Sequence, residues 1–321
     1  MVSASLTKTT LLSLDEKLSS LVAPSGEKVG ICFIDLKTGW ELQINGRKKY
    51  PAASVIKLAV MAAAYHLSET GQLDLGKKLR LEEKDKLGGS GVLQWMKAGR
   101  EYTIWNLIRM MIVLSDNTAT RMLVDEIGRE NINLYLQSIG LNQSNILDDT
   151  MLNEPPLPMN LTTPEEMALL LIKIHQSRIF NLSSSREMLS FMKNQRYRWG
   201  IWRGVPRGIV VADKTGEVGG VLNDAGIVFS TSGPYVLSVF TNGFKRLREA
   251  RLVINQVSSL VYEAYTGIKV KLASPVIRKR IIKKYRKPIR RYRRSYKYQK
   301  RIRKSLNSPV PGSQEIFSSR T

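Results

Sequence analysis

A serine and a lysine stand at i and i+3 in the run PAASVIKLAV, as Ser54 and Lys57. Residues with this spacing share one face of a helix, so we expect the two side chains to lie within reach of each other. The residues around Lys57 are apolar on nearly every side, which is typical of a buried helix. Burial lowers the pKa of an ammonium group, and a neutral amine can take the proton of a nearby hydroxyl. The spacing therefore predicts an activated serine, with a lysine that reaches solvent from a half-buried helix as the alternative.

Two further tripeptides place polar groups at the ends of apolar runs. Ser-Asp-Asn at 115–117 follows LIRMMIVL, and Lys-Thr-Gly at 214–216 closes the strand-like run GIVVAD. Each has an ordinary explanation when it is taken alone, as a helix N-cap and as a strand end. A second Lys-Thr-Gly at 37–39 illustrates how readily this tripeptide occurs. The information lies in the combination with Ser54 and Lys57, in this order along the chain.

S-x-x-K, S-D-N and K-T-G together are the signature of class A β-lactamases and penicillin-binding proteins. The sequence resembles the class A serine β-lactamase family over about residues 8–266. Supporting matches are GGSGVLQ at 88–94, SDNTAT at 115–120, LN at 152–153, TTPEEMA at 162–168 and DKTG at 213–216. The resemblance implies a serine hydrolase that opens the β-lactam amide bond through an acyl-enzyme and needs no cofactor or metal.

The resemblance assigns the acylation steps to three residues. Ser54 attacks the lactam carbonyl, Lys57 accepts or relays the serine proton, and Ser115 passes a proton to the departing nitrogen.

The same resemblance assigns substrate binding to residues of the second and third motifs. Asn117 holds the side-chain amide of the substrate and steadies the buried amine. Lys214 and Thr215 meet the substrate carboxylate, with Gly216 beside them. The backbone N–H groups of Glu217 and of the nucleophile form an oxyanion hole, in which one donor is typically worth about 10²–10³ in rate.

The step that hydrolyses the acyl-enzyme departs from the family pattern. Family members activate water with a glutamate three residues before Leu-Asn, and here Asp149 holds that position relative to 152–153. Aspartate is one methylene shorter, and a misplacement near 1 Å can cost about 10²-fold in rate. We therefore expect intact acylation and slower deacylation than in a typical family member. Asp148 and Glu154 are the substitutes, and a solvated turn is the alternative explanation of the two aspartates.

A second departure concerns the cation that many family members place soon after K-T-G. Residues 217–233 contain no Lys or Arg, which leaves Arg203 and Arg207 upstream as candidates. Asn223 and Asp224 are expected to shape the turn between the following strands.

The elements that position these motifs follow from hydrophobic periodicity. An amphipathic first helix carries Leu11, Leu12, Leu14, Leu18 and Leu21, and further helices are predicted over 54–69, 102–114, 118–127, 164–175 and 246–265. A hairpin turns at 37–39, and strands return in GIVVADKTG, DAGIVFS and PYVLSVFTNG. This order predicts an α+β fold with a mostly antiparallel sheet. The catalytic domain would span 1–268, with a helical subdomain at roughly 47–195.

The positive charge belongs to the end of the chain. From Lys269 onward there are 19 Lys/Arg and one acid, a net +18 of the total +23, so residues 1–268 carry +5. The segment 269–321 is predicted to be a disordered or partly helical basic tail. Its part 269–304 would bind a polyanion such as nucleic acid, anionic lipid or wall polymer, with a solvated tail that adheres only nonspecifically as the alternative. A polyanion-binding protein is therefore an alternative function of another class.

Several functions are disfavoured by composition. The only histidines, His66 and His175, lie near no motif, which argues against a Ser–His–Asp triad and a His-based zinc site. The single Cys32 is expected to be a buried small hydrophobe. No segment has the pattern of a membrane span, and the start lacks the uninterrupted apolar core of a signal peptide. Because the family is normally exported, the compartment is left open.

The runner-up function is a penicillin-binding D,D-peptidase or a penicillin sensor. Such a protein uses the same nucleophile, lysine and K-T-G but turns over penicillin poorly, and its substrate is peptidoglycan-like. A related amidohydrolase or an inactive homologue is the remaining alternative. We expect a monomer whose small substrate is a β-lactam or is peptidoglycan-like.

Overall fold

The computed structural model describes residues 6–148 and 159–272 of the 321-residue chain. Its contacts divide the chain into two units, Met1–Leu272 and Ala273–Thr321. The predicted division at 268/269, with a helical subdomain inside the first part, stays a prediction. All that follows concerns the first unit.

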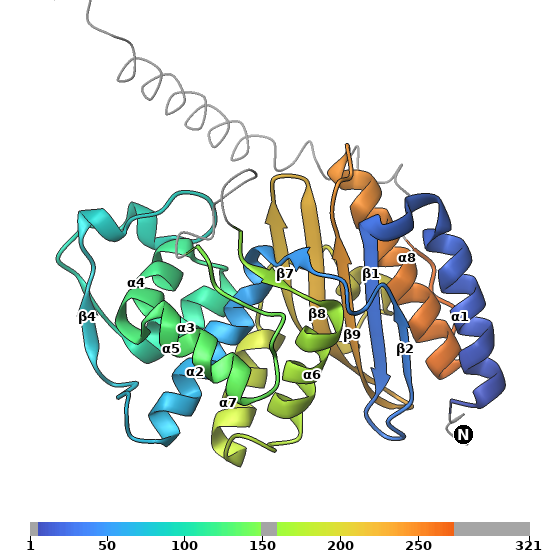
Figure 1. The fold of residues 1–321 in the computed structure, drawn as a ribbon, viewed down its shortest axis with the longest axis horizontal. Helices are drawn as coiled ribbons and strands as arrows, with labels where there is room; N and C mark the ends of the chain where they lie inside the picture. Colours follow the sequence, from blue (N-terminus) through green and yellow to red (C-terminus); the bar gives the residue numbers. More distant parts are fainter. Residues whose placement is uncertain (1–5, 149–158, 273–321) are drawn as a thin grey trace, which may run out of the picture. The chain divides into compact units, whose positions relative to one another are not determined.

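A five-stranded antiparallel sheet forms one half of this unit (Figure 1). The strand order is β2-β1-β9-β8-β7. The bounds are β1 Val29–Asp35, β2 Glu41–Ile44, β7 Val210–Val218, β8 Val221–Ser230 and β9 Gly233–Thr241. β1 and β2 form the predicted hairpin, with Ile34 opposite Glu41. β1 also pairs with β9, so strands that are far apart in the sequence are neighbours in one sheet. The predicted α+β class with a mostly antiparallel sheet is confirmed.

Helices cover both faces of the sheet. α1 (Lys8–Val22) and α8 (Leu247–Thr266) pack against each other on one side, while α6 (Pro164–His175) contacts β1, β8 and β9 on the other, as Figure 1 shows. α1 buries Leu14 and Leu18, whereas Leu12 is 58% exposed, so its apolar face is narrower than predicted. α8 ends where Gly267 adopts φ +72, a conformation that glycine reaches without strain.

The second half is helical and is built around α2 (Lys57–Glu69). Residues 57–65 of α2 are all buried, as the apolar run predicts. Three helices pack against it, α3 Ile104–Val113, α4 Asn117–Ile127 and α5 Arg129–Ser138, and α7 Leu182–Lys193 packs against α3 and α6. Two small ribbons complete it, β3 Tyr50–Pro51 with β6 Leu161–Thr162, and β4 Lys78–Arg80 with β5 Glu101–Thr103. Five short 3₁₀ turns are η1 Ala23–Lys28, η2 Ala53–Ile56, η3 Glu83–Asp85, η4 Leu93–Trp95 and η5 Ile201–Gly204.

Three details differ from expectation. The helix predicted from residue 54 begins with the 3₁₀ turn η2, and α3 starts at Ile104, where Thr103 caps it. The turn between β7 and β8 is made by Gly219 and Gly220, both at positive φ, rather than by the Asn-Asp pair at 223–224, which lies buried inside β8. Within the described ranges, no helix is both long and apolar enough to cross a membrane.

Candidate active site

Ser54 follows a strained elbow at the start of η2. Ala53 has φ +46, a left-handed conformation that a non-glycine residue keeps only when its surroundings hold it. Asn223 on β8 provides part of that support, because its Nδ2 donates to the carbonyls of residues 51 and 52 at 2.8 and 3.1 Å. The N–H of Ala52 in turn donates to the carbonyl of Asn160 at 2.7 Å. The nucleophile position is thus fixed by the sheet on one side and by residue 160 on the other.

Lys57 lies on the first turn of α2, and its side chain is fully buried. Its Nζ donates to the Ser115 carbonyl at 2.8 Å, to Asn117 Oδ1 at 2.7 Å and to Ser115 Oγ at 3.3 Å. Burial lowers the pKa of Lys57 well below its usual value, the charge of Lys214 lowers it further, and Asp116 opposes the shift. Since the acceptors of Lys57 within residues 6–148 and 159–272 are all neutral, this geometry favours the uncharged amine.

The contacts of Lys57 differ from the sequence prediction in one respect. A direct hydrogen bond between Lys57 and the Ser54 hydroxyl was expected, but none forms among the residues that the structure describes. The amine instead reaches the break between α3 and α4, because a buried amine needs acceptors and Ser-Asp-Asn supplies them.

Ser115 occupies that break and holds the second strained backbone of the site, with φ +53. Its hydroxyl oxygen accepts from Lys57 Nζ at 3.3 Å and from Lys214 Nζ at 3.0 Å. The hydroxyl therefore lies between two buried amines. This is a suitable position for a group that passes a proton from one atom to another.

Asp116 pins the loop at residues 88–95 to the start of α4. It caps α4 by accepting from the N–H of Ala119 at 3.0 Å, and it also accepts from the N–H groups of Val92 and Leu93 at 2.6 and 2.9 Å. Gly91 has φ +100, and an added Cβ there would come within 2.2 Å of the Asp116 carboxyl carbon. The GGSGVLQ stretch thus requires glycine where it crosses this aspartate.

Asn117 is oriented by the same loop. Its Nδ2 donates to the Gly88 carbonyl at 3.0 Å, and its backbone N–H donates to the Ser90 carbonyl at 3.1 Å. These bonds turn its Oδ1 toward Lys57. The loop therefore sets the position of one acceptor of the buried amine.

β7 carries Lys-Thr-Gly along the edge of the sheet and packs against η2. A Cβ at Gly216 would lie 3.0 Å from the Ser54 nitrogen and 3.0 Å from the Ala53 Cβ, so a side chain there would push the strand away from the nucleophile. Lys214 Nζ also donates to the Thr215 carbonyl at 2.8 Å. The third motif is thereby placed against the first, and Glu217 follows directly.

Lys214 is fully buried on the face of β7 that contacts Ser115, and two carboxyl groups lie near it on the other face of the sheet. Burial lowers its pKa to about 7, while Asp213 and Asp224 act in the opposite direction. Burial also raises the pKa of Asp213 to about 7 and the pKa of Asp224 well above its usual value. Gln195 Nε2 donates to Asp213 at 3.0 Å, and the Ile201 N–H donates to Asp224 at 2.7 Å. Neighbouring buried carboxyls resist ionising together, so the pair whose charge acts on the lysine carries less than its full negative charge.

Comparison with known proteins agrees with this geometry. The model of the Beta-lactamase enzyme family matches residues 13–265. The chain belongs to this family. It is a serine hydrolase of the class A β-lactamase type, and the predicted resemblance is confirmed.

Three relatives illustrate the likeness. β-Lactamase CTX-M-8 of Citrobacter amalonaticus is 25% identical over 264 residues, which cover 78% of this chain and 89% of that protein. A β-lactamase structure from Sphaerobacter thermophilus has a TM-score of 0.74 and 29% identity, covering 82% of this chain and 98% of its own. The structure of PBP-A has a TM-score of 0.73 and 29% identity, covering 80% and 97%. The chain is therefore similar both to β-lactamases and to PBP-A.

The water-activating base of this β-lactamase family member is expected in the segment around Asp149. The structure describes the residues on either side of 149–158. Asp149, the Leu-Asn pair at 152–153 and Glu154 lie outside the described residues. Asp148 is buried, so a solvated turn is wrong for this residue. Its N–H donates to Asn160 Oδ1 at 2.8 Å, and its carbonyl accepts from Asn160 Nδ2 at 2.8 Å. Because the Asn160 carbonyl also accepts from the N–H of Ala52, Asn160 links Asp148 to the Ser54 elbow.

An arginine that was not among the predicted candidates contacts Glu217, the residue after K-T-G. Arg251 on α8 places Nη2 3.5 Å from Glu217 Oε2 and lies over the Trp199 ring at 5.1 Å. Arg203, one of the two expected candidates, instead donates to the Arg198 carbonyl at 3.1 Å. A lone arginine on an amphipathic helix carries no sequence signal for such a contact.

Histidine and cysteine take no part in the β-lactamase site. His66 stacks on Tyr135, His175 lies edge-on to Phe229, and Cys32 is buried in β1. In residues 6–148 and 159–272, no group of three His, Cys, Asp or Glu side chains is arranged to hold a metal ion.

Proposed function

We propose that the protein is a serine β-lactamase that forms an acyl-enzyme on Ser54 and hydrolyses it more slowly than it forms. The observation that carries this proposal is the environment of Lys57, which is fully buried among neutral acceptors one turn from the nucleophile. A neutral amine there is a competent base at neutral pH, and general-base catalysis contributes typically about 10²–10⁴ in rate.

In the proposed acylation, the Ser54 hydroxyl adds to the lactam carbonyl and its proton passes to Lys57, directly or through a water. The tetrahedral oxyanion accepts hydrogen bonds from the N–H groups of Ser54 and Glu217. These two groups can lie close together because Gly216 has no side chain between β7 and the elbow. When the C–N bond breaks, the lactam nitrogen takes the Ser115 proton. Ser115 recovers a proton through the neighbouring amines, which both contact its hydroxyl.

Substrate binding falls to the other residues of the three motifs. Asn117 donates to or accepts from the substrate's side-chain amide, and Lys214 and Thr215 bind its carboxylate, the first as a cation and the second as a hydroxyl donor. Arg251, through its contact with Glu217, is the second cation of this subsite. These assignments fit a small β-lactam or a peptidoglycan-like substrate bound by a monomer.

Deacylation is assigned to water activated by Asp149. The hydrogen bonds between Asp148 and Asn160 support this assignment. They link residue 148, which directly precedes Asp149 in the sequence, to the Ser54 elbow. The carboxylate is one methylene shorter than the glutamate that the family pattern has there, which is the reason for expecting a long-lived ester.

A penicillin-binding D,D-peptidase or sensor is the second candidate, and the likeness to PBP-A favours it. A PBP-A mutant that is 30% identical to this chain, with a TM-score of 0.74, was solved as an acyl-enzyme complex with penicillin G. Turnover of a chromogenic cephalosporin, measured beside release of D-alanine from a peptide, separates the two functions. Cephalosporin turnover without D-alanine release supports the β-lactamase, and the reverse supports the peptidase.

A further inference from the structure

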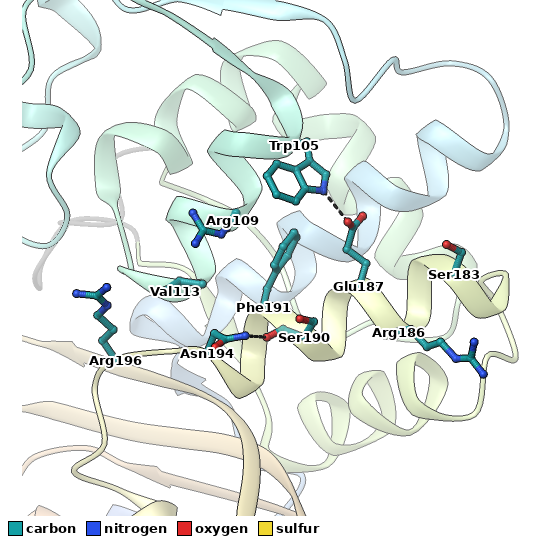
Figure 2. Close-up of a pocket in the computed structure, with 10 residues that line it drawn as sticks. All are labelled: Trp105, Arg109, Val113, Ser183, Arg186, Glu187, Ser190, Phe191, Asn194 and Arg196. Atoms are coloured by element: carbon teal, nitrogen blue, oxygen red, sulfur yellow. Dashed lines mark hydrogen bonds between the residues drawn. The ribbon is translucent and has the colours of Figure 1, made fainter.

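A cavity of about 610 Å³ opens between α3 and α7, outside the residues of the catalytic site (Figure 2). Its lining residues are Trp105, Arg109, Val113, Ser183, Arg186, Glu187, Ser190, Phe191, Asn194 and Arg196. We call this feature the α3–α7 groove.

The α3–α7 groove is rich in unpaired positive charge. Arg109, Arg186 and Arg196 are exposed, and none of the three forms an ion pair with another described residue. In Figure 2, Arg109 and Arg196 lie toward one end of the groove and Arg186 toward the other. Guanidinium groups bind carboxylate and phosphate through parallel N–H donors, so each end offers a site for an anionic group.

The single acid of the lining does not neutralise these arginines. The two carboxylate oxygens of Glu187 accept from the Tyr65 hydroxyl at 2.5 Å and from the Trp105 indole N–H at 2.7 Å. Glu187 is thereby held against the wall of the groove. The lining therefore carries three cations and one anion that is bonded elsewhere, a net of 3 − 1 = +2, which favours an anionic ligand.

Between the charged ends lie an apolar surface and small polar groups. Trp105 and Phe191 pack edge to face, with ring centroids 5.5 Å apart. Ser183 and Ser190 add hydroxyl groups beside them, and Asn194 donates to the Ser190 carbonyl at 2.8 Å. A ligand that joins the two ends would cross this middle section.

We propose that the α3–α7 groove binds a small ligand that carries anionic groups at two separated positions, held by Arg186 at one end and by Arg109 with Arg196 at the other. Phosphate and carboxylate groups share the required chemistry. The inference does not rest on Ser54 or on any other residue of the proposed hydrolysis.

The test uses the indole N–H signals of the full-length ¹⁵N-labelled protein. The chain has five tryptophans, none of them after Trp202, so the basic tail contributes no indole signal. Trp105→Phe identifies the signal of the groove. Inorganic tripolyphosphate, citrate and orthophosphate are titrated separately, because they offer linked phosphates, linked carboxylates and a single anion.

We expect the chemical shift of the Trp105 signal to change and to reach saturation with tripolyphosphate or citrate. The anion that binds more tightly identifies the preferred class, phosphate or carboxylate. The double variant Arg109→Gln/Arg196→Gln should weaken binding at least about tenfold, since hydrogen bonds to charged groups are strong. Arg248→Gln, which removes an exposed cation on α8, is the matched control and should leave the affinity unchanged. The other four indole signals check that each variant is folded.

Three results would overturn the proposal. The Trp105 signal could remain unshifted with tripolyphosphate and with citrate, while both anions bind to the basic tail. It could respond equally in the double variant and the wild type. Orthophosphate could also saturate it as tightly as tripolyphosphate, in which case two separated anionic groups are not required.

Discussion

The helical half and the sheet each contribute one fully buried lysine to the site, and the two lysines differ in their surroundings. Among the described residues, Lys57 Nζ donates only to neutral acceptors, whereas the charges of Asp213 and Asp224 act on Lys214 from the other face of the sheet. Both donate to Ser115 Oγ. Burial lowers both pKa values, and nearby carboxyls oppose that shift mainly at Lys214. The same residue type is therefore suited to be a base in one half and an anion-binding cation in the other.

This difference teaches that burial alone does not decide what a lysine does. A buried amine without a carboxylate partner loses its proton readily, and one with partners keeps its charge to a higher pH. Five experiments test this comparison and the site around it.

Replacing Lys57 by alanine should give the largest loss. We expect the acylation rate constant to fall by about 10²–10⁴, because the serine loses its base. Rapid-quench measurement of acyl-enzyme formation with benzylpenicillin follows this step directly. A loss no larger than that caused by Lys214→Gln would erase the distinction between the two lysines.

Asp149→Glu should restore the length of the side chain and speed deacylation by up to about 10²-fold. Asp149→Asn should slow the same step and leave acylation unchanged. The decay of the acyl-enzyme after excess drug is removed measures both effects. Rapid multi-turnover hydrolysis in Asp149→Asn would contradict the assignment of the base.

Lys214→Gln should raise KM by about 10–100-fold with a smaller change in kcat, because a hydrogen bond to a charged group is lost. A methyl-ester substrate, which lacks the carboxylate, is the control and should bind both forms alike.

The same lysine predicts a pH dependence. Its pKa is lowered to about 7, so Lys214 carries its charge below that pH and loses it above. We expect kcat/KM for a carboxylate substrate to fall as the pH rises through about 7, and the fall to vanish in Lys214→Gln. An alkaline limb that persists in the variant would assign the titration to another group.

The smallest effect is expected for Asn223→Ala. Asn223 holds the carbonyls of residues 51 and 52 and accepts from the Thr241 N–H at 2.9 Å, so its loss should cost about 1–3 kcal/mol of unfolding free energy. Acylation should also slow a few-fold, because the Ser54 elbow relaxes. Asn255→Ala is the matched control, since Asn255 makes similar bonds to the carbonyls of residues 199 and 200. Asn223→Ala should lower both the unfolding free energy measured in urea and the acylation rate, whereas Asn255→Ala should lower only the unfolding free energy.

Periodicity and turn residues were enough to predict the class of the fold. The hairpin at 37–39, the three C-terminal strands and the core helix around Lys57 all follow from local pattern. The ranges of α5 and α7 were not predicted, because the polar residues of RENINLYLQS and LSSSREMLSFMK obscure the short face that each helix buries. Tertiary packing stabilises them instead.

The motifs predicted which residue types meet, but not how they are held. The positive φ values of Ala53 and Ser115 are imposed by neighbours and leave no trace in the sequence. Asn223 was taken for a turn residue, although its bonds cross between β8 and the elbow. Arg251 reaches Glu217 from a helix that is far along the chain. Contacts of this kind depend on the folded arrangement and not on local pattern.

Intact-mass spectrometry after mixing with benzylpenicillin tests the central claim most directly. The account predicts a single adduct with the full mass of the drug, formed quickly, decaying slowly and absent from Ser54→Ala. An adduct that persists in Ser54→Ala, or drug destruction that proceeds unchanged in that variant, would contradict it.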